Sequence, residues 1–320
     1  MNISVVTAAY NAAGSIRELL GALVAQTQPP VQIIVADDGS GDETATVAEK
    51  LGATVLRLPH GGPAQARNAG AQAATSDIIV FIDSDCIPQP DFLEKLTAPL
   101  QSGAADAAKG AYRTRQKSFA ARFAQLEFEE RYARLSRQSN IDFVDSYAMA
   151  ILRRVFTESG GFDSSFPRAD NEDVDLSYRL GRLGARMVFI PDAVVFHQHP
   201  ASWWRYFRTK VGRGYWRFKV YAQYPAKAFR DSYTPQTLKL QMLALLLFIP
   251  AVVLAVIFLN PWFLIVPAVL FLFFSLPFLI RAIHSSFLLF VISLWGLLLR
   301  AKALILGSIA GFWQFVVIKK

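Results

Sequence analysis

The acidic residues of this sequence gather at the ends of short apolar runs, where they suit metal and phosphate chemistry. Residues 78–82 are five consecutive apolar residues, followed at once by Asp83, Ser84 and Asp85. A run of this length and type is typical of a strand buried on both faces. In open α/β sheets, ligands bind beyond the carboxyl ends of the strands. Two carboxylates placed there suit a hard divalent cation that carries a phosphate-bearing ligand.

A second acidic pair, Asp37 and Asp38, ends the apolar run of residues 31–36. A carboxylate at such a strand end accepts hydrogen bonds from a ribose hydroxyl or a base N–H. Because Gly39 and Ser40 follow, the same residues also have the composition of a simple turn. Both interpretations stay open at this point.

A third group lies in residues 170–175, where four of six residues are acidic. Acidic residues in the first turn of a helix complement its dipole, and Asp170 suits the N-cap. One or two acidic residues suffice for that purpose, so the excess indicates a functional carboxylate. A carboxylate held at a helix start suits general base catalysis.

The elements around these groups alternate between strand and helix. The first run is not followed by the glycine-rich turn of a dinucleotide site. Alternation of this kind is typical of βαβ units and of an α/β fold with a mostly parallel sheet. The sequence predicts strands at 3–7, 31–36, 54–58, 78–82, 104–112, 142–152 and 186–190, and helices at 15–26, 42–51 and 63–74. Residues 119–135 have apolar positions at helical spacing, and we expect this amphipathic helix to pack on the sheet rather than to contact an acceptor.

Composition divides the chain. Hydrophobic residues make up 53% of the sequence, the net charge is +8, and no acidic residue follows position 240. A positive balance indicates nucleic acid or an anionic membrane surface, and the adjoining apolar tail favours the membrane. The single Cys86 excludes an internal disulfide. The strand-like first residues predict that there is no cleavable signal peptide.

The C-terminal part predicts a helical membrane region. Residues 240–259 and 262–280 are each long and apolar enough to span a bilayer. Residues 287–318 are apolar but contain Arg300 and Lys302, so they form either one tilted span beside an interfacial helix or a re-entrant pair. We expect three parts: 1–200 as the catalytic domain, 201–239 as a basic aromatic interfacial segment, and 240–320 in the membrane. Flanking basic residues predict a multi-pass protein of the plasma (inner) membrane with a cytoplasmic catalytic domain.

Several motifs in order resemble family 2 glycosyltransferases of the GT-A fold. The resemblance covers roughly residues 1–215. The motifs that carry it are Ser-Val-Val-Thr-Ala-Ala-Tyr-Asn at 4–11, Ile-Ile-Val-Ala-Asp-Asp-Gly-Ser at 33–40, Ala-Arg-Asn-Ala-Gly at 66–70, Phe-Ile-Asp-Ser-Asp at 81–85, Gly-Gly-Phe-Asp at 160–163 and Asn-Glu-Asp-Val-Asp-Leu-Ser-Tyr-Arg at 171–179.

The resemblance implies an inverting transferase that uses a nucleotide-sugar donor with Mg²⁺ or Mn²⁺. Asp173 matches the catalytic base, with Glu172 as the reserve. Asp85 matches the metal position, and a late histidine, His197 or His199, joins it unless the two are only a surface pair; we favour His197. The donor is expected to contact Thr7, Tyr10, Asp38, Arg67, Asp83 and Arg213.

The predicted acceptor is a polyprenyl phosphate or another lipid-linked glycan, because a soluble acceptor would not need the basic segment and the apolar helices. Processive family members carry Q-x-x-R-W, whereas this chain has Lys210-Val-Gly-Arg213-Gly214 in the comparable place. A processive polysaccharide synthase is therefore the less favoured alternative, and a non-catalytic membrane scaffold is another. We expect no nucleic acid partner. The nucleotide base, the sugar and the acceptor are left open by the sequence.

Overall fold

The computed structural model describes residues 1–166, 170–229 and 234–318. They divide into two compact units. Residues 1–115 and 134–198 form the first, here called the sheet unit, and residues 116–133 and 199–320 form the second, the helical unit. Residues 116–133, which we expected within a catalytic domain of residues 1–200, thus group with the C-terminal helices.

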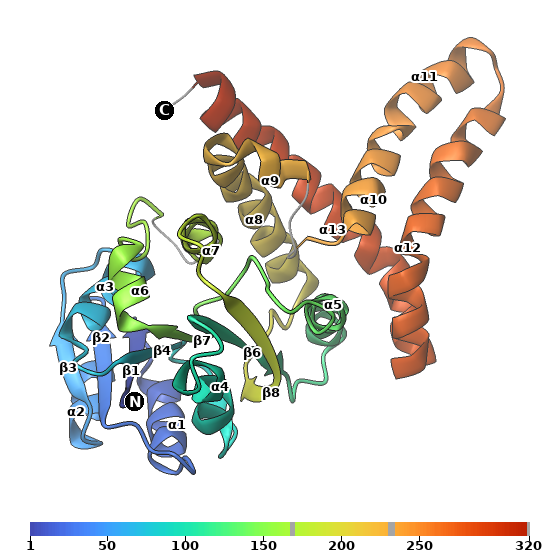
Figure 1. Ribbon diagram of the computed structural model, residues 1–320. Coiled ribbons are helices and arrows are strands. Elements are labelled where there is room, and N and C mark those ends of the chain that lie inside the picture. Colours follow the sequence, from blue (N-terminus) through green and yellow to red (C-terminus); the bar gives the residue numbers. More distant parts are fainter. Residues whose placement is uncertain (167–169, 230–233, 319–320) are drawn as a thin grey trace. The chain divides into compact units, whose positions relative to one another are not determined.

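The sheet unit is built on one mixed sheet of eight strands in the order β3-β2-β1-β4-β7-β6-β8-β5 (Figure 1). The strands are β1 (Ile3–Ala9), β2 (Gln32–Asp37), β3 (Thr54–Arg57), β4 (Ile78–Ile82), β5 (Ile87–Pro88), β6 (Ala107–Arg113), β7 (Ala148–Leu152) and β8 (Met187–Phe196). The helices are α1 (Ala13–Val24), α2 (Thr44–Lys50), α3 (Pro63–Ala73), α4 (Phe92–Gln101), α6 (Arg153–Glu158) and α7 (Glu172–Arg182).

Strand β4 is the centre of this unit. It pairs in parallel with β1 and antiparallel with β7, and all five of its residues are buried. The prediction of a strand buried on both faces is therefore confirmed. Because β1 also pairs in parallel with β2, the carboxyl ends of β1, β2 and β4 lie at the same edge of the sheet. This edge receives the acidic pairs singled out in the sequence.

Strand β8 is longer than the predicted strand at residues 186–190. Pro191 favoured an end there, because a proline cannot donate to a strand ladder. The structure instead continues the strand to Phe196, with an irregularity in its pairing to β6 between Lys109 and Ala111. A bulge of this kind accommodates the proline and carries the strand on towards His197.

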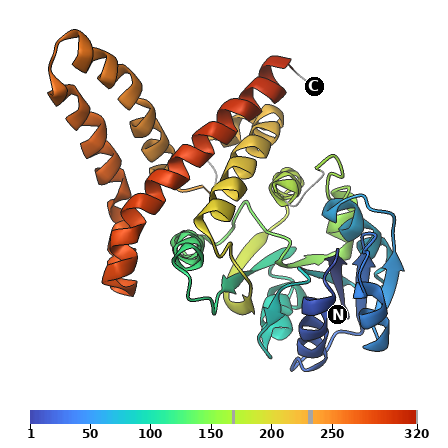
Figure 2. The same cartoon turned by 180° about the vertical axis from the view of Figure 1, so that it is seen from behind.

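The helical unit contains no strand within its described residues. Its elements are α5 (Phe119–Leu135) up to residue 133, α8 (Trp203–Gln223), α9 (Pro225–Phe229), α10 (Gln236–Leu246), α11 (Phe248–Ile257), η1 (Pro261–Leu264), α12 (Ile265–Ser285), α13 (Phe287–Phe312) and the π-helical η2 (Trp313–Ile318). Three stretches are long and apolar enough to cross a membrane: Gln236–Ile257, Pro261–Ser285 and Phe287–Ile318. The first two form a helical hairpin that turns at η1 (Figures 1 and 2).

The core of the helical unit forms around Phe123 of α5. Its ring lies 5.5 Å from that of Tyr206 on α8 and 5.0 Å from that of Phe278 on α12, measured between centroids. On α13, a Cβ added to Gly296 would lie 2.8 Å from the Phe123 ring. The apolar face of α5 is thus buried among helices, so our prediction that it packs on the sheet is wrong for these residues. The periodicity showed which face is apolar, but not which element covers it.

Helices α8 and α13 lie side by side in both views and approach each other closely (Figures 1 and 2). A Cβ added to Gly307 would lie 2.0 Å from the carbonyl oxygen of Val211, and one added to Gly311 would lie 2.3 Å from that of Tyr215. Glycine at these positions lets the two backbones touch.

This contact predicts opposite effects for one substitution at two helical glycines. Gly307→Ala should destabilise the protein by about 1–3 kcal/mol, because the new methyl group must push the helices apart. Gly21→Ala on α1 is the matched control. A Cβ there meets no heavy atom within 4 Å among the described residues, so it should stabilise by about 0.5–1 kcal/mol. Thermal unfolding in detergent measures both, and a neutral Gly307→Ala would contradict the packing.

Candidate functional site

The site lies in the sheet unit, beyond the carboxyl ends of β1, β2 and β4. Thr7 of β1 is fully buried, and its Oγ1 has no hydrogen-bond partner among the described residues. A buried hydroxyl without a partner is rare, because its desolvation is not compensated. Thr7 therefore offers a hydrogen-bonding group to a ligand at this edge, at one of the positions predicted for the donor.

Asp38, at the end of β2, is buried and holds the turn that precedes α3. Its Oδ1 accepts the backbone N–H groups of Gly61 at 2.8 Å and Gly62 at 3.1 Å. Gly62 has a φ of +93°, which favours glycine. The His60 ring lies 3.0 Å from Oδ2 and stacks on Tyr10, whose side chain is half exposed. Asp38 thus has a structural role, and its contact with the nucleoside stays a prediction.

Asp37 supports the turn interpretation of this motif. Its Oδ1 accepts the backbone N–H of Ser40 at 3.2 Å and also the Ser40 hydroxyl. Side-chain bonds of this type are typical of Asx turns. Asp37 therefore fixes the loop.

Arg67 joins two acidic groups that are far apart in the sequence. This α3 residue is buried, with Nη2 2.8 Å from Oδ1 of Asp83 and Nη1 2.8 Å from Oε1 of Glu172. Burial opposes the charged guanidinium, but the two carboxylates outweigh it and hold the pKa of Arg67 above its ordinary value. We expected Arg67 to meet a phosphate. The structure shows it as a bridge between the end of β4 and the start of α7, and its contact with the donor stays a prediction.

Asp85 lies two residues beyond Asp83, and its side chain is 49% exposed. Its Oδ2 is 3.2 Å from Nε2 of His197. Burial of the carboxyl group opposes ionisation, but the hydrogen bond and charge of His197 outweigh it, so the pKa of Asp85 lies below its ordinary value. Asp85 is therefore ionised at neutral pH, as a metal ligand must be.

Strand β6 fixes the orientation of His197. The imidazole stacks on Tyr112, with 4.4 Å between ring centroids and 6° between ring planes. The backbone N–H of His197 donates to the Arg113 carbonyl at 2.9 Å. His199 belongs to the helical unit, where its Nε2 is 2.9 Å from Oε1 of Gln125. Of the two histidines, His197 is the one beside Asp85.

The residues near Asp85 suit a cation that a ligand helps to hold. Within the described parts of the chain, no three acidic, histidine or cysteine side chains gather as a ready metal site. Asp85 and His197 would supply two ligands at the sheet edge, and Mg²⁺-type sites commonly combine one or two carboxylates with substrate phosphates. The pair thus fits a divalent cation whose remaining ligands come from a diphosphate.

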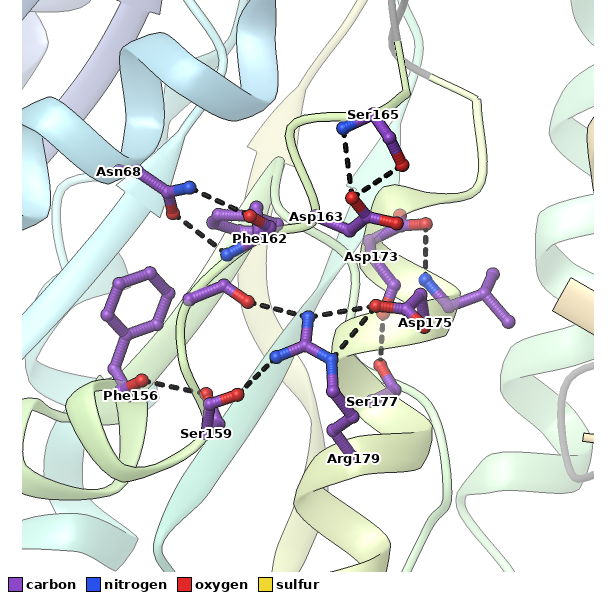
Figure 3. Close-up of polar contacts among 12 residues, drawn as sticks. Asn68, Phe156, Ser159, Phe162, Asp163, Ser165, Asp173, Asp175, Ser177 and Arg179 are labelled. Atoms are coloured by element: carbon purple, nitrogen blue, oxygen red, sulfur yellow. Dashed lines mark hydrogen bonds and ion pairs between the residues drawn. The ribbon is translucent and has the colours of Figure 1, made fainter. Parts of the chain in front are cut away.

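Asp173 and Glu172 begin α7 but lie in different surroundings. Asp173 is partly exposed, and its Oδ1 accepts the N–H of Val174 at 2.8 Å (Figure 3). Glu172 is buried, with Oε1 on Arg67 and Oε2 accepting the N–H of Asp170 at 2.8 Å. Both Glu172 oxygens are thus engaged in holding structure, and the choice of Asp173 as the base stays a prediction.

Arg179 and Asn68 hold α7 and the loop at Gly161, and neither was singled out in the sequence. Arg179 donates from Nε to Asp175 at 2.9 Å, from Nη2 to the Gly161 carbonyl at 2.6 Å, and from Nη1 to the Ser159 carbonyl (Figure 3). The i,i+4 spacing of Asp175 and Arg179 signals their pair. The carbonyl contacts have no sequence signal, since any residue carries a carbonyl.

Asn68 ties the same loop to α3. Its Nδ2 donates to the Phe162 carbonyl at 2.8 Å, and its Oδ1 accepts the Phe162 N–H at 2.8 Å (Figure 3). A Cβ on Gly161 would lie 2.6 Å from this Oδ1, so the loop must approach closely there. Asn68 and Arg179 thus clamp the loop at Gly161 from two sides.

Arg213 lies on α8 in the helical unit. Its role toward the donor stays a prediction.

Known proteins resemble this chain in sequence and in fold. Residues 4–160 match the model of glycosyl transferase family 2. Residues 4–160 therefore resemble a family 2 glycosyltransferase domain, and the fold is of the GT-A type. The predicted fold class, a mostly parallel α/β sheet followed by apolar C-terminal helices, is confirmed.

Curated glycosyltransferases match a large part of this chain. A pre-mycofactocin glycosyltransferase of Mycobacterium tuberculosis is 32% identical over 208 residues, which are 62% of this chain and 43% of the relative. The probable glycosyltransferase YdaM of Bacillus subtilis is 28% identical over 233 residues, 66% of this chain and 54% of the relative. The chain thus spans about half the length of these relatives.

Among solved structures, a mannosyltransferase from Pyrobaculum calidifontis in complex with GDP-Man and Mn²⁺ resembles this chain with a TM-score of 0.59. The identity is 21%, and the match covers 98% of this chain and 87% of that one. At this identity the likeness shows the fold.

The bridge at Arg67 predicts a large stability effect. Arg67→Met should destabilise the sheet unit by about 3–5 kcal/mol, because Glu172 is left buried without its partner. Arg57→Met is the matched control, since Arg57 pairs with Glu49 at an exposed site and should change stability little. Chemical unfolding of both variants distinguishes them. Equal stabilities would show that the buried bridge does not hold the unit together.

Proposed function

We propose that this protein is an inverting glycosyltransferase that moves a sugar from a nucleotide-sugar donor to a lipid-linked acceptor with Mg²⁺ or Mn²⁺. The observation that carries the proposal is the Arg67 bridge. It holds the end of β4, which continues to Asp85, against the start of α7, which presents Asp173. A metal–diphosphate position and a base are thereby held on the same support.

The donor is proposed to bind along the sheet edge. Tyr10 offers an exposed ring for the nucleobase, and Thr7 and Asp38 offer polar groups to the nucleoside. Bound at Asp85 and His197, a divalent cation would stabilise the negative charge of the departing diphosphate. The fold neighbour with GDP-Man and Mn²⁺ supports a donor and metal of this type.

Asp173 is proposed as the catalytic base. With a lipid-linked glycan as the acceptor, a sugar hydroxyl attacks the anomeric carbon, its proton passes to the Asp173 carboxylate and the bond to the diphosphate breaks. A single displacement of this kind inverts the anomeric carbon. The backbone support of Asp173 includes its carbonyl, which accepts the Ser177 hydroxyl at 2.6 Å, so the helix start is held in place.

The acceptor is proposed to be a polyprenyl phosphate or a related lipid-linked glycan at the plasma membrane, with the sheet unit in the cytoplasm. The three long apolar stretches of the helical unit support a membrane location. A processive synthase and a non-catalytic scaffold remain the alternatives. Purified protein that neither transfers sugar from nor hydrolyses any nucleotide sugar would favour the scaffold, whereas products longer than one added sugar would favour the synthase.

The role of Asp85 gives a binding prediction. Asp85→Ala should abolish the Mn²⁺-dependent part of nucleotide diphosphate binding and leave the fold intact. Thermal stabilisation by nucleotide, with and without Mn²⁺, measures this, because a ligand that binds the folded state raises the melting temperature. Asp192→Ala, at an exposed carboxylate, is the control. Retention of full Mn²⁺-dependent stabilisation by Asp85→Ala would refute the metal assignment.

The role of Asp173 gives a kinetic prediction. Asp173→Asn keeps the shape of the side chain but cannot take up the proton, so transfer should fall at least about a hundredfold with near-normal donor binding. Rates of transfer and nucleotide affinity are both measured, with the exposed Glu158→Gln as the control. A variant that transfers normally, or one whose loss follows from unfolding alone, would move the base to another residue.

A further inference from the structure

Helix α8 is strongly cationic and is packed along α13. It carries six basic residues among 21: Arg205, Arg208, Lys210, Arg213, Arg217 and Lys219. Acidic residues are absent from this helix. A segment of this charge is expensive to place in hydrocarbon. The depth at which α8 can lie relative to a bilayer therefore limits the depth of any helix packed beside it.

The contact between α8 and α13 extends along most of α13. The rings of Trp203 and Trp295 lie 4.7 Å apart, and those of Phe218 and Phe312 lie 6.0 Å apart. Between these ends, the glycine at 307 brings the two backbones together. The residue numbers rise together on both helices, so α8 and α13 run in the same direction. They form one rigid pair, here called the α8–α13 pair.

A buried ionic cluster fixes the middle of α13 to charged helices. Nη1 of Arg300 lies 3.2 Å from Oε1 of Glu127 on α5, and Nζ of Lys210 lies 2.7 Å from Oε2 of the same carboxylate. The Tyr206 hydroxyl donates to Glu127 at 2.9 Å, and Nη2 of Arg300 donates to Gln241 at 2.8 Å. One turn of α13 is thus held level with α5 and α8, and Lys302 beside it is exposed.

These contacts oppose a bilayer crossing by α13. If residues 287–318 crossed, the packing would carry α8 and its cations into the hydrocarbon. The first two apolar stretches meet this cluster at Gln241, which accepts from Arg300, and at Phe278, whose ring centroid lies 5.2 Å from the Arg300 guanidinium carbon, but α8 is not packed along them as it is along α13. Only 17% and 28% of their apolar windows is buried in the protein, against 44% for α13. Their exposed surface is the kind that lipid covers.

We infer that the α8–α13 pair lies in the plane of the membrane surface, against anionic lipid headgroups, and that only the hairpin of α10, α11 and α12 enters the bilayer. The pair has the composition that an interface requires. Trp204, Ile309 and Trp313 are each at least 60% exposed and supply apolar contact, while the exposed Arg205 and Arg208 match lipid phosphates. This inference differs from both arrangements left open for residues 287–318, a tilted span beside an interfacial helix and a re-entrant pair, and it does not depend on glycosyl transfer.

The inference fixes which positions share a side of the membrane. Gln236–Ile257 and Pro261–Ser285 have 22 and 25 residues, enough to cross and return. The turn of the hairpin, at the 90% exposed Leu259, then lies on the far side from residues 236 and 285. The whole of α13 stays on the near side. A crossing α13 would instead place its end on the side of Leu259.

Cysteine labelling tests this in the full chain. Cys86→Ser removes the native thiol, and single cysteines are then introduced as Glu49→Cys, Leu259→Cys, Lys302→Cys and Val316→Cys. Each protein is labelled in sealed vesicles with a membrane-impermeant maleimide, from one side and then from both sides after permeabilisation. We expect positions 49, 302 and 316 to be labelled from one side and position 259 from the other.

Two results would overturn the inference. Labelling of position 316 from the same side as position 259 would show that α13 crosses. Labelling of position 259 from the side of position 49 would show that the hairpin does not. Labelling of every variant in detergent confirms that each thiol reacts, and retained thermal stabilisation by nucleotide confirms that each protein is folded.

Discussion

The structure of the site depends on one buried cation. Removing the Arg67 guanidinium from water is unfavourable, and the two carboxylates that face it are unfavourable to bury without it. Each of the three groups therefore requires the other two, and the geometry that satisfies them brings the end of β4 to the start of α7. Asp85, proposed to bind the cation on the donor diphosphate, is attached to the first of those ends, and Asp173, proposed as the base, is attached to the second. Without this bridge, the same strands would not fix the end of β4, which leads to Asp85, against the start of α7, which carries Asp173.

The residues that hold the site and those proposed to react are separated by their exposure. Three of the holding residues, Arg67, Glu172 and Asp38, are buried and form their hydrogen bonds within the protein. Asn68 and Arg179 hold the loop at Gly161 from two sides. Asp85, Asp173 and Tyr10 sit next to these groups but remain at least partly exposed. A rigid interior beneath an accessible surface is what precise positioning of a substrate requires, since binding energy is not then spent on ordering the protein.

Local patterns predicted what local interactions decide. The run before Asp83 is buried on both faces, and the alternation with helices produced the expected parallel neighbours, because periodicity and chain order carry that information. The partner of Arg67 lies 105 residues away at Glu172, and nothing near Arg67 distinguishes a phosphate ligand from a bridge. The partner of α5 was missed for the same reason. An apolar face shows only that a helix is covered, and the Phe123 ring finds its neighbours on α8 and α12, more than seventy residues further along the chain.

The helical unit shows the same dependence on a buried ion pair, with a consequence for how apolar segments are interpreted. Burial opposes ionisation of Glu127, but Lys210 and Arg300 outweigh it and lower its pKa to about 2, so the carboxylate stays charged and binds α5, α8 and α13 together. Hydropathy treats each helix as if it met lipid alone, and on that basis three stretches qualify as spans. Once a charged helix is packed along one of these stretches, the free energy of insertion must include the charged helix as well as the apolar one. Apolar length is then a requirement for crossing a membrane, but the charges packed against a helix decide whether it crosses.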